Sequence, residues 1–298
     1  MVGTACFRFA VLIALTTSAT SVSAQDAELT LEPATQWTAD FADRHCGIRR
    51  TFSSGEHSVL LELKQYLPGR SFEATVVSRT LEPSGDAPVA EFQPGPVLDA
   101  SATYQTIEAA GGWKGVVFSD SFELSALNDE NGSAEELDPA AITHYSLHDA
   151  FDYDLRLQTG ALTGVIDVLD RCMDDLVSSW GLVPEEQRTL SKRSEIPDNS
   201  SWIRQYFRHA EDIEDRFNTG VPVSVLVVDA EGVPQRCHTL NIPGEAASDN
   251  ELCEFVLENA RFEPGLDAQG APISSLHFLS LSRVRVETYS TLTPISPR

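Results

Sequence analysis

Histidine and carboxylate side chains gather in one short stretch of the sequence, between residues 144 and 154. His144 and His148 are followed closely by aspartates at positions 149, 152 and 154. In a helix, a histidine pair at i, i+4 lies on one face and can bind zinc. The glutamate that follows the first histidine in zinc proteases is absent, because Tyr145 stands there. The residues that follow alternate as in a strand. We therefore expect a solvated loop here rather than a metal site, and we predict no metal ligand.

Motifs for nucleophilic catalysis are missing from the chain. It has no Gly-x-Ser-x-Gly elbow, no Ser-x-x-Lys motif and no glycine-rich phosphate loop. Its 45 acidic residues allow many carboxylate pairs of the glycosidase kind, and no pair stands out. We predict no catalytic residue and no cofactor. The alternative is an exported hydrolase that acts through the N-terminal part of the chain.

The N-terminus resembles an export signal. Arg8 supplies a positive charge, Phe9 to Leu15 form an apolar segment, and Ser21 to Ala24 form a small-residue cleavage site. The apolar segment is shorter than the roughly 20 residues that span a bilayer. We expect residues 1–24 to be removed as a signal peptide, and no stable membrane insertion.

Cysteine usage also fits an exported protein. Removal of the signal would take Cys6 and leave Cys46, Cys172, Cys237 and Cys253. Four cysteines allow three pairings. We favour Cys237–Cys253, which would tie a strand to the helix that follows, and this leaves Cys46–Cys172. A four-thiolate zinc site is the rival interpretation, but the chain has no Cys-x-x-Cys pair.

Composition limits the class of partner. The formal net charge of −24 makes nucleic acid an unsuitable partner, because phosphate binding needs a basic face. The simpler interpretation of this negative charge is that it keeps the protein soluble. The more specific interpretation is that it attracts a basic segment of a partner.

The elements that would position these residues form two regions. Residues 25–182 are predicted to be β-rich, with a hairpin over Ser58–Tyr66 and Ser71–Ser78, and a strand over Trp113–Phe118. An extended run is predicted over Ala150–Leu157. The region ends in an amphipathic helix, Ala161 to Trp180, whose apolar residues recur at helical spacing.

A polar stretch separates the two regions. Residues 183–200 are predicted to form a linker, and Ser201 to Phe217 a second amphipathic helix. Residues 201–290 then form the last domain. Ser248 and Glu251 resemble a capping box in front of a short helix.

The last domain carries an ordered set of motifs. Gly220 leads into the alternating valine strand 221–228, which turns at Asp229 to Gly232. A second extended run holds Cys237, and a short helix holds Cys253. Ala260-Arg261-Phe262-Glu263-Pro264 and Asp267-Ala268-Gln269-Gly270-Ala271-Pro272 follow, before a final strand from residue 275. We therefore predict an α+β protein, with a β-rich N-terminal domain followed by a small ββαβ domain.

This order of motifs resembles the TonB C-terminal domain family, whose energy transducers act in the Gram-negative envelope. The resemblance covers about 70 residues, and Gly265 replaces the alanine usual in the family pattern. In that family the domain contacts outer-membrane transporters, and an exposed sheet edge pairs with an extended peptide of the partner. The family's transducers also have a retained membrane helix and a proline-rich spacer, and we expect this chain to have neither.

The resemblance implies a periplasmic, non-enzymatic protein that binds an envelope protein or peptide, with a TonB-dependent outer-membrane transporter as one candidate partner and a link to transmembrane transport. The implied docking edge is the last strand. Its predicted partner-binding residues are Leu276, Phe278, Ser280, Ser282 and Val284. The other interpretation is that the last domain only packs against the first.

Overall fold

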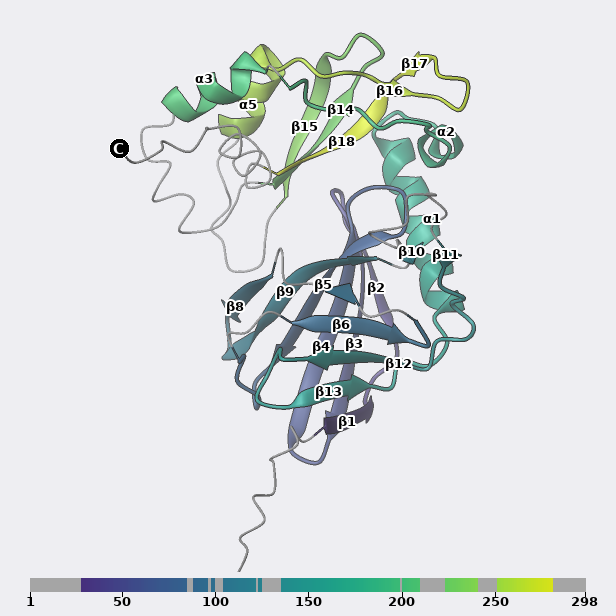
Figure 1. Cartoon of the computed structure of the whole chain (residues 1–298), viewed down its shortest axis with the longest axis vertical. Helices are drawn as coiled ribbons and strands as arrows, with labels where there is room; N and C mark the ends of the chain where they lie inside the picture. Colours follow the sequence, from purple (N-terminus) through teal and green to yellow (C-terminus); the bar gives the residue numbers. More distant parts are fainter. Residues whose placement is uncertain are drawn as a thin grey trace, which may run out of the picture.

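The computed structural model describes residues 28–84, 88–95, 98–99, 104–121, 123–124, 135–198, 200–209, 223–240 and 251–280. These residues form an α+β fold that is mostly sheet, with a few helices (Figure 1). The predicted signal peptide, Ser248 of the predicted capping box, and residues 210–217 of the predicted second helix lie outside the described residues.

A curled sheet of eleven strands makes up most of the N-terminal region. The strands follow the order β7-β6-β12-β13-β1-β3-β4-β5-β9-β8, and β2 pairs with β3 beside this path. Their bounds are β1 Glu28–Pro33, β2 Thr38–Phe41, β3 Cys46–Ser54, β4 His57–Gln65, β5 Ser71–Ser78, β6 Val89–Gln93, β7 Leu98–Asp99, β8 Gln105–Ala109, β9 Trp113–Ser121, β12 His144–His148 and β13 Asp154–Leu157. Short strands β10 (Glu123–Leu124) and β11 (Glu135–Glu136) pair separately.

Alternating apolar residues line the concave face of this sheet. The predicted hairpin is confirmed as β4 and β5, and the predicted strand at Trp113 as β9. The rings of Phe72 on β5 and Phe92 on β6 lie 6.0 Å apart between centroids, although many strands separate them in the sheet order. The sheet must therefore curl until its far parts share one core.

Two other predictions for this region need correction. The run Ala150–Leu157 is a strand only over β13, because Ala150 to Tyr153 form the turn from β12, with Asp149 at a positive φ of 58°. His144 and His148 lie within β12, which pairs with both β6 and β13. They are therefore part of the sheet and not of a solvated loop.

The predicted amphipathic helix is confirmed as α1 (Thr163–Ser179). Its buried residues include Val165, Leu169 and Leu176, which recur at helical spacing. The helix ends before Gly181, whose φ of 82° suits a residue without a side chain. A disulfide between Cys172 on α1 and Cys46 on β3 holds the helix against the sheet.

The segment 183–200 is not a free linker. It contains the short helix α2 (Pro184–Arg188), and its extended part exchanges backbone hydrogen bonds with the loop that precedes the last strand. Glu195 and Glu263 bond to each other through both backbone groups, at 3.0 and 2.8 Å, and Lys192 pairs with Leu266. The polar composition of this segment predicted a linker. Its structure is instead decided by backbone pairing, which composition does not encode.

A second, three-stranded sheet follows in the order β15-β14-β18. Both neighbours run antiparallel to the central β14. The bounds in this region are α3 Ser201–His209, β14 Val223–Val228, β15 Pro234–Leu240, α5 Glu251–Asn259, β16 Gly265–Leu266, β17 Pro272–Ile273 and β18 Ser275–Ser280. Along the chain the order is therefore two strands, a helix and, after the short β16–β17 pair, a last strand.

The two faces of this small sheet belong to different cores. Leu226, Val228 and Leu279 pack with residues of α3 and α5. Val225, Val227 and Leu276, which alternate with them, belong to the core of the large curled sheet and α1. The sheet is thus buried on both sides. Among the described residues, no helix is both long enough and apolar enough to cross a membrane.

Candidate functional site

β18 is an edge strand, and it is the place where the sequence predicts partner binding. It pairs with β14 from Val228↔Ser275 to Val223↔Ser280, and no strand of the described chain pairs with its other side. Edge strands present unpaired N–H and C=O groups that can accept another strand. The state of these groups therefore decides whether the edge can bind a partner.

The side chain of Gln187 covers the first part of this edge. Its Nε2 donates to the carbonyl oxygen of Ser274 at 2.8 Å, and its Oε1 accepts the N–H of Leu276 at 3.2 Å. Gln187 is only 1% exposed. The side-chain amide thus makes the pair of bonds that a neighbouring strand's peptide groups would make.

Ser194, from the same covering segment, lies over the next groups of the edge. Its Oγ is 3.5 Å from the carbonyl oxygen of Leu276, and its own carbonyl oxygen is 2.8 Å from Nδ1 of His277. His277 also packs on Phe262, with ring centroids 4.7 Å apart. Burial lowers the pKa of His277, so the ring stays neutral near neutral pH and donates from Nδ1 to this carbonyl.

The edge opens at Phe278. In an antiparallel strand, alternate residues direct their backbone N–H and C=O groups to the same side. The backbone groups of Ser274, Leu276 and Phe278 therefore all point away from β14. Within the described part of the chain, no hydrogen bond reaches the outward N–H or C=O of Phe278. Its side chain is 37% exposed.

Aromatic rings from the large sheet lie beside this open position. The ring of Tyr66, which directly follows β4, lies 5.7 Å from that of Phe278, and His45 lies 6.0 Å from Tyr66. An extended segment placed against Phe278 would put a side chain over these rings. The open edge and the rings of Phe278 and Tyr66 together form the candidate site.

A cluster of titratable groups lies next to Tyr66. The Tyr66 hydroxyl donates to Glu73 Oε1 at 3.1 Å, and Lys64 pairs with Glu62 at 3.0 Å. Burial is the main cause that raises the pKa of both Tyr66 and Glu73. A carboxyl with a raised pKa is what a general acid needs. Here, however, the carboxyl is half-buried and accepts a hydrogen bond from Tyr66, which suits a structural role.

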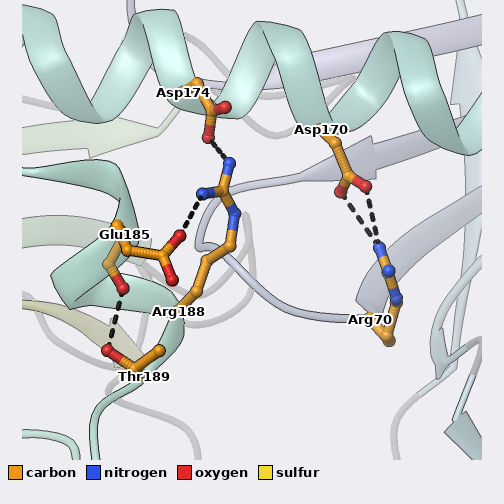
Figure 2. Close-up of polar contacts among 6 residues, drawn as sticks. All are labelled: Arg70, Asp170, Asp174, Glu185, Arg188 and Thr189. Atoms are coloured by element: carbon orange, nitrogen blue, oxygen red, sulfur yellow. Dashed lines mark hydrogen bonds and ion pairs between the residues drawn. The ribbon is translucent and has the colours of Figure 1, made fainter.

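An ion pair with α1 holds α2, the helix that carries Gln187, in place over the edge (Figure 2). The Arg188 guanidinium on α2 donates to Asp174 on α1 and also pairs with Glu185 at 3.3 Å. One turn earlier on α1, Asp170 accepts two bonds from Arg70 of the β4–β5 loop, at 3.0 and 3.2 Å. One acidic face of α1 therefore holds both the loop beside Tyr66 and the helix that carries Gln187.

The predicted partner-binding residues differ in their burial and in their position on the edge. Leu276 is fully buried, so a partner could reach only its backbone, which Gln187 already occupies. Phe278 is at the open edge. Ser280 ends β18. Ser282 and Val284 lie outside the described residues.

The remaining predicted residues have clear positions. The chain contains the disulfides Cys46–Cys172 and Cys237–Cys253, which is the pairing that the sequence favours. His148 bonds to Asp154 at 2.9 Å, whereas His144 bonds to Thr143 at 2.8 Å, so the two histidines do not converge. In the described ranges, no group of three or more His, Cys, Asp or Glu residues is placed to hold a metal ion.

Sequence reasoning missed Gln187, Ser194 and Tyr66. Gln187 is the buried residue of a five-residue helix that otherwise consists of Pro184, two glutamates and Arg188, so no apolar periodicity marks it. Tyr66 falls at the end of a correctly predicted hairpin strand, and its partner Phe278 is 212 positions later, a pairing that local patterns do not reveal.

Comparison of this chain with known proteins gave no relative. No protein-family model matches it, no curated protein matches it, and no solved structure matches it.

Proposed function

We propose that this chain is an exported, periplasmic and non-enzymatic protein that binds an extended segment of an envelope protein at the edge of β18. The observation that carries the proposal is the outward backbone of Phe278, which has no hydrogen-bond partner among the described residues and lies on an edge strand whose preceding positions are capped. Backbone pairing at an edge gives affinity without a catalytic site. The two disulfides support export, because such bonds persist in oxidising compartments.

The TonB-like order of motifs supports the choice of partner class. The chain has β14, β15, α5 and β18 in the order that the resemblance implies, and Gly232 and Gly270 both adopt a positive φ in turns. A TonB-dependent outer-membrane transporter is accordingly the first candidate. The exported hydrolase is a weaker alternative, since the Tyr66–Glu73 pair is half-buried and its hydrogen bond is made internally.

The proposal is tested by crosslinking in cells. A photo-reactive amino acid replaces Phe278 and, as a matched control, Glu254 on the exposed side of α5. We expect crosslinks to one envelope protein from position 278 and none to that protein from position 254, identified by mass spectrometry. Crosslinks from position 278 only to residues 37–180 of the same chain would show that the small sheet serves internal packing.

A further inference from the structure

Residues 184–194 lie where a partner strand on β18 would lie. Gln187 bonds to two successive outward positions, Ser274 and Leu276, while the third, Phe278, has none of these bonds among the described residues. Resting on the proposed function, we infer that residues 184–194 form an edge cap that keeps a partner strand off Ser274 and Leu276 and leaves Phe278 available for pairing. We also infer that the partner's residue opposite Phe278 is apolar or aromatic.

The geometry of the bonds gives the first argument. A side-chain amide offers one donor and one acceptor, as a peptide group does. Gln187 uses both, at 2.8 and 3.2 Å, on groups that a paired strand would need. A partner strand cannot bond to Leu276 while Gln187 does, because each outward N–H has one place for an acceptor.

The direction in which side chains project from the sheet indicates which type of partner residue fits opposite Phe278. Residues directly opposite on neighbouring strands project to the same face of the sheet and contact each other. The residue opposite Phe278 therefore projects toward Tyr66, whose ring lies 5.7 Å from that of Phe278. Aromatic and β-branched side chains pair best with an aromatic neighbour in a sheet. A charged side chain at this position would lose part of its hydration where it contacts the rings of Phe278 and Tyr66.

The α2 end of the cap is held less firmly than its extended part, where Ser191 and Lys192 make backbone hydrogen bonds to Leu266. Its ion pair, Arg188 to Asp174, joins side chains that are 38% and 40% exposed, and such pairs contribute little to stability. The buried part of the contact is the Gln187 side chain and the Ser194 hydroxyl. The α2 end of the cap can thus open while the sheet beneath it and the backbone bonds of residues 191–192 stay in place.

The experiment uses the full-length mature chain and a fluorescent synthetic peptide of alternating Val and Thr residues, with a central Phe and a Lys at each end. Binding is measured by anisotropy, and the amides of Leu276 and Phe278 are followed by NMR hydrogen exchange. In the wild-type chain we expect the peptide to slow exchange at Phe278 and to leave Leu276 unchanged. A peptide with alternate backbone nitrogens methylated, or with Asp in place of Phe, should not bind.

Two variants open the cap by different means. Gln187→Ala removes both bonds, and Arg188→Ala releases α2 without touching β18. In the free protein, Gln187→Ala should speed exchange at Leu276 by roughly tenfold, the effect of one lost hydrogen bond. Both variants should bind the peptide several-fold more tightly, with protection now extending to Leu276. Glu186→Ala, at the adjacent exposed position of α2, should behave as wild type.

The outcomes separate the inference from the function on which it rests. If the peptide binds at Phe278 with the same affinity and footprint in all variants, the cap is refuted while edge pairing stands. Unchanged exchange at Leu276 in free Gln187→Ala would also refute the cap. If the peptide protects neither amide in any variant, edge pairing itself is wrong.

Discussion

His148 is held between carboxylates of neighbouring strands, so its protonation is coupled to folding. The hydrogen bond to Asp154 on β13 is the main cause that raises its pKa above the ordinary value, and Glu91 on β6 adds to the effect. A group whose pKa is raised on folding contributes stability below its unfolded pKa of about 6.5, and the contribution is lost as the pH rises through the folded value.

We therefore expect His148→Gln to lower the free energy of unfolding more at about pH 5.5 than at about pH 8. Because the side chain is 38% exposed, the difference should stay below about 1 kcal/mol. Urea unfolding at both pH values measures it. His144 is the matched control on the same strand, since burial lowers its pKa and reverses the sign. Equal losses for His148→Gln at both pH values would contradict the coupling.

At the scale of elements, the two disulfides differ in the length of chain that they close. Cys46–Cys172 spans 126 positions and joins β3 to α1, whereas Cys237–Cys253 spans 16 and joins β15 to α5. In the chain-entropy account, the longer loop stabilises by about 5 kcal/mol and the shorter by about 3 kcal/mol. The Cys46→Ala/Cys172→Ala variant should therefore lose more stability in urea unfolding than Cys237→Ala/Cys253→Ala, and the reverse order would contradict this account.

Local chemistry explains which elements could be predicted from the sequence. The turn at Asp229 is an example, because Asp229 Oδ1 accepts from Glu231 and Val233, and Gly232 adopts the positive φ that ends the turn. Helix α1 and the β4–β5 hairpin were predictable for similar reasons, as their periodicity repeats over many residues. The role of segment 183–200 was not predictable. It depends on bonds between residues more than 60 positions apart, such as Glu195 with Glu263.

At the scale of the whole molecule, the last region is not an independent body. Val225, Val227 and Leu276 lie in the same core as the large sheet and α1, and Trp180 of the N-terminal region stacks on His238 of β15 at 5.1 Å. Arg44 also donates to the carbonyl oxygen of Thr239 at 2.8 Å. A shared core of this kind favours unfolding as one cooperative unit. The candidate site lies at this junction, so its geometry depends on both regions.

Val227→Ala tests this cooperativity. Val227 is 6% exposed and faces the shared core, so its truncation should lower the free energy of unfolding by about 1 to 3 kcal/mol. We expect native-state hydrogen exchange to show the same loss for the slowest amides of β14 and of β4, although β4 belongs to the other sheet. Phe41→Ala serves as the control, because Phe41 is 55% exposed on β2 and its truncation should change neither. A loss at β14 with unchanged protection at β4 would mean that the two sheets open separately. The edge of β18 could then move relative to Tyr66, and the candidate site would not be preformed.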